Sequence, residues 1–304
     1  MKMLNSIKFS LLSVALVAAA SHSKAQLSPL GTMYFQNQYV NNPAYAGTDK
    51  DLRLDAGVRL QDSRMPGSPK IQFITATYAL SDKAGLGFNL NAEQIGLIKK
   101  VRSVATYAYH LPLNTEDKLS FGLSLGFTDQ VVDYNMIDGQ TNDGTLGNFN
   151  QRDTYVDGDF GIRYKHKQFT LEGAIPNLSN FYRDKTKTGS VSNLARYYAA
   201  ASYQYDLSGT NGTILEPKLA FRAVDGFKDI FDLGLNVRFI DDKLNIFGLY
   251  HTSQSATLGI AAKLTANMSM NFMYTSATAV LAGESSGSYE INLRLDLFKR
   301  KNKN

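Results

Sequence analysis

The chain has 304 residues, no cysteine and a formal net charge of +5, and 43% of its residues are hydrophobic. The absence of cysteine excludes disulfides, thiol catalysis and thiolate metal sites. No run of about 20 apolar residues is present, so the chain cannot cross a membrane as a hydrophobic helix. Most of the basic excess lies at the two ends, because the first 25 residues hold three lysines and residues 299–304 hold four basic side chains. The body between them lacks a basic surface suited to nucleic acid.

The amino terminus has the three parts of a secretory signal peptide. Two lysines precede or flank an apolar core at residues 9–20, and Ser23-Lys24-Ala25 places small residues at the cleavage position. We therefore predict a signal peptide over residues 1–25 and a mature chain that starts at Gln26. The apolar core is too short to be a membrane-spanning helix.

Residues 26–50 do not alternate as a strand would. They contain the run Met33-Tyr34-Phe35-Gln36-Asn37-Gln38-Tyr39-Val40-Asn41-Asn42-Pro43-Ala44-Tyr45-Ala46-Gly47. Pro43 favours extended geometry at Asn42, and Gly47 allows a positive φ before the first strand, so this stretch is predicted to form a fixed turn. The run holds too many aromatic residues for a free tail. We expect it to pack against the wall of the domain that follows or to plug its mouth; a cap over the base and a partner-docking surface remain alternatives.

From residue 51 to residue 298, short alternating stretches are separated by turns. In Leu119-Ser120-Phe121-Gly122-Leu123-Ser124-Leu125-Gly126-Phe127, every odd position is large and apolar and every even position is Ser or Gly. This period favours a strand between an apolar phase and a polar interior. The pattern predicts an all-β fold, a transmembrane antiparallel up-and-down β-barrel of about fourteen strands. The predicted strands are 52–61, 70–80, 85–94, 100–111, 118–128, 155–165, 168–175, 194–206, 213–224, 229–240, 243–251, 256–264, 267–276 and 287–298.

The lengths of the connections predict the orientation of the barrel. Those after even-numbered strands are short, whereas the long ones, at 129–154, 176–193 and 277–286, follow odd-numbered strands. Outer-membrane barrels have short periplasmic turns and longer outer loops. We therefore place both ends of the barrel, with the basic tail 299–304, in the periplasm.

The alternation also predicts which side chains face inward. Residues 229–240 place Leu233 and Leu235 towards lipid and Asp232 towards the lumen, and the first and last strands likewise turn charged residues inward. We expect these inward charges to pair across strands. Glycines that follow the tight turns, such as Gly85 and Gly122, are predicted to permit strand curvature.

The sequence offers weak signals for chemistry. Residues 138–144 hint at a calcium loop, but the sixth-position glycine and the closing glutamate are missing, so a solvated loop is favoured. Ser253, close in sequence to His251, is the one candidate for the Ser–His pair of a hydrolase. Gly85-Leu86-Gly87 lacks the third glycine of a nucleotide-binding loop. We predict no catalytic residue, metal ligand or cofactor, and no enzymatic activity.

The signal peptide, the aromatic and Asn/Gln-rich stretch, the block Asn42-Pro43-Ala44-Tyr45-Ala46-Gly47 and the barrel together resemble the PorP/SprF family of the type IX secretion and gliding apparatus of Bacteroidota. The specific part is residues 34–37 with the block 42–47, that is Tyr34, Phe35, Gln36, Asn37, Asn42, Pro43, Ala44, Tyr45, Ala46 and Gly47.

The resemblance implies a non-enzymatic protein of the outer membrane that aids secretion or surface attachment of a large adhesin-like cargo. It also implies type IX secretion components and peptidoglycan-associated lipoproteins as partners. On this basis the long outer loops are expected to contact cargo, and the short turns with residues 26–50 to face the periplasmic partners. The candidate cargo-contact residues are Asp138, Asn142, Asp143, Phe149, Phe181 and Tyr182. The alternative is an outer-membrane channel for a small or hydrophobic solute, with residues 26–50 as its plug.

Overall fold

The computed structural model describes residues 33–49, 52–61, 67–132, 153–182, 195–207, 212–224, 228–239, 243–278 and 285–297. Its strands are β1 (Leu52–Gln61), β2 (Lys70–Ala79), β3 (Ala84–Ile95), β4 (Ile98–Pro112), β5 (Asp117–Val132), β6 (Asp153–His166), β7 (Phe169–Ile175), β8 (Ala195–Tyr203), β9 (Tyr205–Leu207), β10 (Thr213–Val224), β11 (Ile230–Phe239), β12 (Leu244–His251), β13 (Ser255–Lys263), β14 (Met268–Thr275) and β15 (Ser288–Leu297). Within the described residues, three short 3-10 helices accompany them: η1 (Gln38–Val40), η2 (Pro43–Tyr45) and η4 (Leu178–Phe181).

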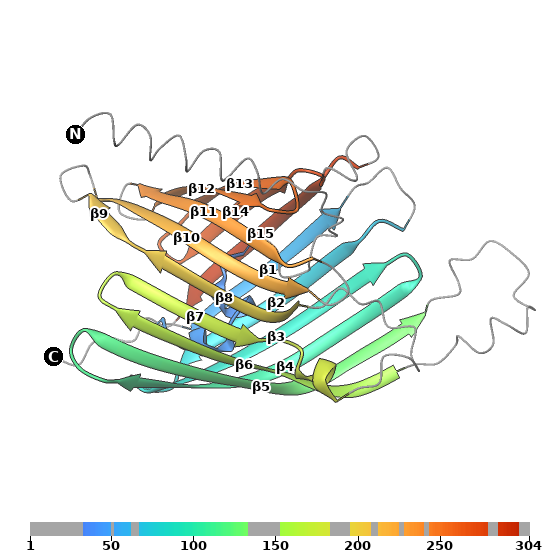
Figure 1. The fold of residues 1–304 in the computed structure, drawn as a ribbon, viewed down its shortest axis with the longest axis horizontal. Helices are drawn as coiled ribbons and strands as arrows, with labels where there is room; N and C mark the ends of the chain where they lie inside the picture. Colours follow the sequence, from blue (N-terminus) through green and yellow to red (C-terminus); the bar gives the residue numbers. More distant parts are fainter. Residues whose placement is uncertain are drawn as a thin grey trace, which may run out of the picture.

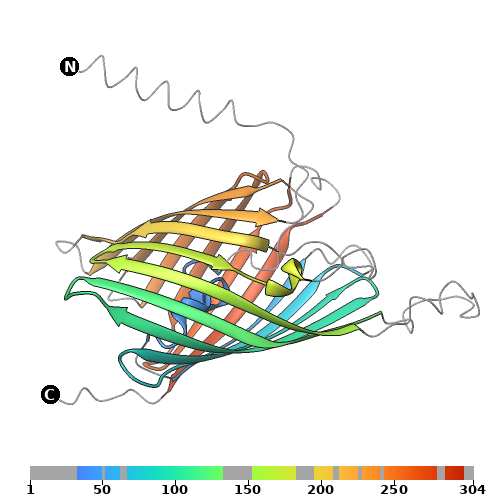
Figure 2. The same ribbon diagram turned by 60° about the horizontal axis from the view of Figure 1, so that its bottom comes forward.

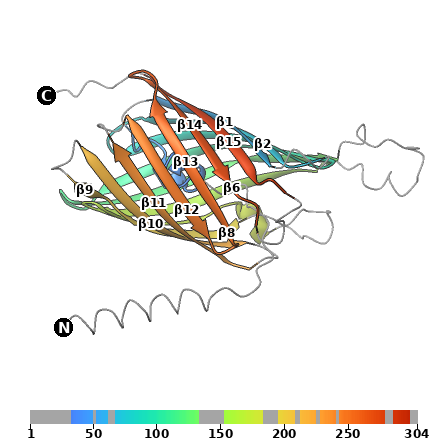
Figure 3. The same cartoon turned by 90° about the horizontal axis from the view of Figure 1, so that it is seen from above.

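The strands close into a barrel (Figures 1 and 3). Except for β8 and β9, consecutive strands along the chain pair antiparallel, and β1 closes the ring by pairing with β15. β8 and β9 both pair with β10 in a single register, since Ser202 lies opposite Lys218 and Tyr205 lies opposite Leu215. They therefore serve as a single strand of the wall that is interrupted at Gln204. The described residues thus confirm the predicted antiparallel barrel of fourteen strands.

The alternation of burial along the strands confirms the predicted facing. In β5 the side chain of Leu125 is 65% exposed, whereas that of its neighbour Ser124 is 2% exposed. In β11, Leu233 and Leu235 are exposed and Asp232 is buried. The outer surface of the wall is accordingly apolar and suits lipid, while the lumen is lined by small, polar and charged groups.

Inward charges pair across strands, as predicted. At the seam between β1 and β15, Arg294 Nε lies 3.0 Å from Asp55 Oδ1. On the far side of the lumen, Lys218 Nζ lies 2.6 Å from Glu172 Oε1, and both side chains are 2% exposed. Because a buried charge without a partner is costly, these pairs are what makes a charged lumen tolerable.

The connections divide into two rims. Tight turns follow β2, β4 and β6 at one rim, and residues 133–152 and 183–194 fall within the connections at the opposite rim. Residues 133–152, 183–194 and 279–284, the signal peptide and the basic tail lie outside the described residues. Within the described ranges, the model contains no helix long and apolar enough to cross a membrane.

The exposed face of β5 provides a test of which side of the wall contacts lipid. Leu125→Arg should destabilise the protein by about 2–4 kcal/mol, the cost of a basic side chain near the bilayer midplane. Urea unfolding of the protein folded into lipid vesicles measures this cost, with Leu125→Met as the size-matched control. Equal unfolding midpoints for the two variants would contradict a lipid-facing Leu125.

Candidate functional site

Residues 33–49, here called the plug, lie inside the barrel (Figure 2, blue). Tyr34, Asn42, Ala44 and Ala46 are fully buried, and Phe35 is half-buried. The remaining residues of the predicted family stretch are also buried, namely Gln36, Asn37, Pro43, Tyr45 and Gly47. The described part of the segment thus occupies the lumen and does not sit as a cap beneath the barrel.

The block at residues 42–47 forms the turn expected from its sequence. Asn42 is extended, with φ −149° and ψ 114°, and its Oδ1 accepts a hydrogen bond of 2.9 Å from the Ala44 N–H. Pro43 then begins the single turn η2, where a missing N–H costs nothing. Gly47 leaves the turn with φ +69°, a conformation that favours glycine.

The plug sits directly against glycines of the barrel wall. A Cβ atom at Gly122 would overlap the backbone of Pro43, and one at Gly161 would overlap Asn42 Oδ1. A Cβ atom at Gly85 would overlap the carbonyl of Ala46. The structure therefore gives Gly85 and Gly122 a role other than the predicted strand curvature: they let the plug backbone approach the wall.

Hydrogen bonds fix the plug in this position. Asn42 Nδ2 donates to the carbonyl oxygens of Ile162, at 3.0 Å, and Gly173, at 3.3 Å. His110 Nε2 lies 3.0 Å from the carbonyl oxygen of Ala46. These contacts use carbonyl groups of the wall and of the plug, so the block is held through its own amide side chain and its backbone.

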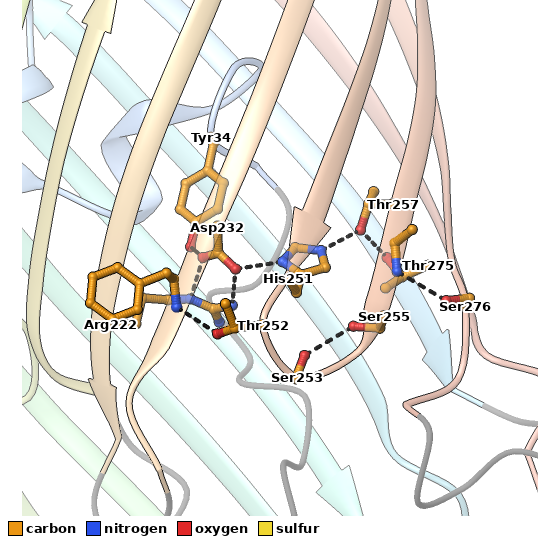
Figure 4. Close-up of polar contacts among 12 residues, drawn as sticks. Tyr34, Arg222, Asp232, His251, Thr252, Ser253, Ser255, Thr257, Thr275 and Ser276 are labelled. Atoms are coloured by element: carbon orange, nitrogen blue, oxygen red, sulfur yellow. Dashed lines mark hydrogen bonds and ion pairs between the residues drawn. The ribbon is translucent and has the colours of Figure 1, made fainter. Parts of the chain in front are cut away.

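A buried ionic cluster holds the other end of the plug (Figure 4). Tyr34 Oη donates to Asp232, whose carboxylate also contacts Arg222 Nε at 2.8 Å and His251 Nδ1 at 2.5 Å. Tyr34 belongs to the plug and not to a membrane-spanning strand; its burial raises the pKa of the phenol well above the usual value, so it remains a neutral donor. Removing it would leave part of the Asp232 carboxylate unsatisfied in a buried site.

The hydrolase candidate is not assembled in the structure (Figure 4). Ser253 Oγ lies 3.1 Å from Ser255 Oγ, and His251 Nε2 lies 2.9 Å from Thr257 Oγ1. A nucleophile and its base must share a hydrogen bond, and Ser253 and His251 do not. Among the described residues no group of three or more His, Asp or Glu is placed to hold a metal ion. The calcium-loop candidate 138–144 lies outside those residues.

Part of the connection after β7 folds onto the barrel mouth opposite the short turns. The backbone N–H of Asn177 donates to Asp159 Oδ1 at 2.9 Å, and that of Ser179 donates to Asp157 Oδ1 at 3.0 Å. Both carboxylates are bound by Arg102, at 2.7 Å each. The connection after β7 is therefore anchored just before and within η4.

This anchor presents two aromatic side chains at the rim opposite the short turns. Phe181 is 49% exposed and packs edge-on against Tyr197 with ring centroids 6.0 Å apart, and Tyr182 is 61% exposed. Phe181 and Tyr182 are the two candidate cargo-contact residues that the structure describes. The others lie outside the described residues, namely Asp138, Asn142, Asp143 and Phe149.

The closed wall and the occupied lumen define a plugged membrane β-barrel of the outer-membrane type. The toluene transporter TbuX of Ralstonia pickettii shares this fold, with a TM-score of 0.53, 11% identity and coverage of 84% of this chain and 92% of that chain. The CymD monoaromatic hydrocarbon channel shares it with a TM-score of 0.54, 10% identity and coverage of 87% and 94%. A search of the curated proteins found no match.

Residues 23–295 match the family described as type IX secretion system membrane protein PorP/SprF. The chain belongs to this family and is a membrane component of type IX secretion, located in the outer membrane. The sequence resemblance is thereby confirmed. Sequence reasoning turned Asp232 towards the lumen by its place in the alternation, but it did not join Tyr34 to Asp232, Arg222 and His251.

The contact between Gly161 and Asn42 yields a test with a matched control. Gly161→Ala should strain the plug by about 1–3 kcal/mol, the usual range for overpacking a filled site. Gly173→Ala, one strand away, should be tolerated because its Cβ would meet nothing closer than 3.6 Å. Hydrogen exchange measured by mass spectrometry should show faster exchange at residues 33–47 in Gly161→Ala alone. Unchanged exchange in a folded Gly161→Ala barrel would contradict the close approach.

Proposed function

We propose that this protein is a non-enzymatic accessory of type IX secretion that aids the secretion or surface attachment of a large cargo protein. The observation that carries the proposal is the plug, which occupies the lumen and is held by buried hydrogen bonds at both ends. A barrel filled in this way acts through its two rims. The outer rim would meet the cargo, and the short turns would meet periplasmic partners.

The outer rim supplies a fitting contact surface for cargo. Phe181 and Tyr182 are exposed aromatic side chains, the residue type that most often dominates binding energy at protein interfaces. The anchoring of Asn177 and Ser179 orders the connection before any partner arrives, which lowers the entropic cost of binding. The candidate residues in 133–152 would extend the same surface.

The periplasmic rim is proposed to contact other type IX components and peptidoglycan-associated lipoproteins. The described part of residues 26–50 is largely buried, so its contribution to such a surface is confined to the end near Thr48 and Asp49, which are partly exposed. We also propose that residues 1–25 are a signal peptide that is absent from the mature chain, and that the basic tail 299–304 lies in the periplasm. We further propose that the protein has no enzymatic activity.

Replacing the outer aromatic pair tests the cargo surface. The double change Phe181→Ala and Tyr182→Ala should reduce recovery of surface cargo in a gentle-detergent pull-down by about tenfold or more, as expected when anchor residues are truncated. The double change Tyr203→Ala and Tyr205→Ala is the control, because this pair, with ring centroids 4.4 Å apart, lies at the opposite rim. Equal recovery with both variants would exclude the outer pair as a cargo contact.

A channel for a small or hydrophobic solute is the second candidate. It is favoured by the names of the two similar structures, a toluene transporter and a monoaromatic hydrocarbon channel, with which the chain shares its fold. Planar-bilayer conductance and liposome swelling with the intact protein separate the two candidates. The accessory function predicts neither effect while the plug is in place, and steady conductance or swelling would favour the channel.

A further inference from the structure

A polar cavity of about 320 Å³ lies between the plug and the wall on the side of the short turns. We call it the basic vestibule. It is lined by Phe35, Gln36, Asn37, Gln38, Tyr39, Tyr45, Thr48, Asp49, Arg53, Thr77, Lys118, Arg163, Lys165 and Arg294. Lys118 is one residue from the start of β5 and Lys165 is one residue from the end of β6. The cavity therefore lies at the rim of the short turns, which we propose faces the periplasm.

The charges around the basic vestibule are unbalanced. Its lining has five basic side chains and a single carboxylate. Arg53 and Arg294 belong to ion pairs of the β1–β15 seam. On the opposite wall, Lys118 lies directly across from Lys165 in the β5–β6 register. Like charges placed opposite each other destabilise a sheet, so this part of the wall favours a negatively charged group nearby.

Two hydrogen-bond donors on the lining also favour an anion in the cavity. Gln36 is 6% exposed, and its Nε2 has no hydrogen-bond partner within the described chain. The buried Nε of Arg163 also lacks one there, while its guanidinium Cζ lies 4.5 Å from the centroid of the Tyr45 ring. A buried donor without an acceptor carries a desolvation penalty. An anionic oxygen in the cavity would remove it for both groups.

The adjoining cavity provides an internal comparison. It has a volume of about 340 Å³ and lies between the plug and the strands β10–β15. There, four basic side chains are opposed by three carboxylates, those of Asp49, Glu216 and Asp296. Its charge is nearly balanced, so it offers no comparable preference for an anion. The excess of donors is specific to the wall formed by β5 and β6.

We propose that the basic vestibule is a binding site for an anionic group, a carboxylate or a phosphate, that enters from the periplasm. Arg163 supplies a planar donor group of the kind that binds both anions, and Lys165 and Lys118 supply ammonium groups. Gln36 adds a neutral donor from the plug. Since Gln36 and Tyr45 belong to the plug, the bound anion would touch the plug and the wall together. This proposal does not depend on the identity of the cargo.

The test uses the full mature chain in detergent and isothermal titration calorimetry. The probes are inorganic phosphate and a triglutamate peptide, with a triglutamine peptide as the neutral control. Lys165→Gln should weaken binding of the anionic probe about tenfold or more, the loss expected for one charge-assisted hydrogen bond. Lys167→Gln is the matched control, because it removes the same charge two residues away at a position outside the basic vestibule, where Lys167 pairs with Glu116 at 3.0 Å.

Each outcome decides the proposal. Saturable binding of phosphate alone, or of triglutamate alone, supports it and identifies the source of the anion as a free phosphate or an acidic peptide. Absence of saturable binding by either probe overturns it, and so does equal weakening by Lys165→Gln and Lys167→Gln. Heat-modifiable migration on gels confirms that both variants form closed barrels. Because Lys165 is partly exposed, its replacement leaves the packing of the plug intact.

Discussion

The room inside the barrel is the constraint on which the rest of the structure depends. Inward side chains fill barrels of about eight strands, and fourteen strands enclose more space than they can fill. The chain fills this space with its own residues 33–49. The plug needs the wall to come close, and the wall provides this where it carries no side chain, at Gly85, Gly122 and Gly161. The space left by these missing side chains, more than the burial of apolar area, determines where the block 42–47 lies.

Polarity is the second consequence of a filled lumen. The inward face holds buried charges, and several of them are balanced by opposite charges on adjacent or next-adjacent strands. The plug completes this arrangement at Asp232, where the Tyr34 hydroxyl joins Arg222 and His251. The buried Asp232 carboxylate is therefore paired at one end of the lumen, while the basic vestibule at the other end has an excess of positive charge.

Much of this fold could be predicted from the sequence because the period of a strand is short and local. The bounds of β1, Leu52–Gln61, and of β10, Thr213–Val224, coincide with the predicted spans, and the facing of Asp232 follows from parity alone. The interruption at Gln204 was not foreseen. It lies beside Pro217 of β10, which has no N–H for the ladder.

The arrangement of the site could not be predicted in the same way. The contact between Asn42 and Gly161 joins residues far apart in sequence, and nothing in the period of β6 distinguishes a glycine that admits a plug from one that permits a bend. The turn at Pro43 and Gly47 was predictable because its causes lie in adjacent residues. Its position in the lumen depends on the three-dimensional closure of the strands.

The contacts of the plug also have a consequence for assembly. Tyr34 precedes the first strand, yet its hydroxyl binds Asp232 of β11, and Arg294 of β15 donates to the carbonyl of Gln36. Residues near the start of the barrel sequence are thus partners of strands in its second half. Once β1 has paired with β15, the wall is continuous on every side of the plug. Closure of the seam therefore completes two structures in one step, the membrane-spanning wall and the internal segment that it encloses.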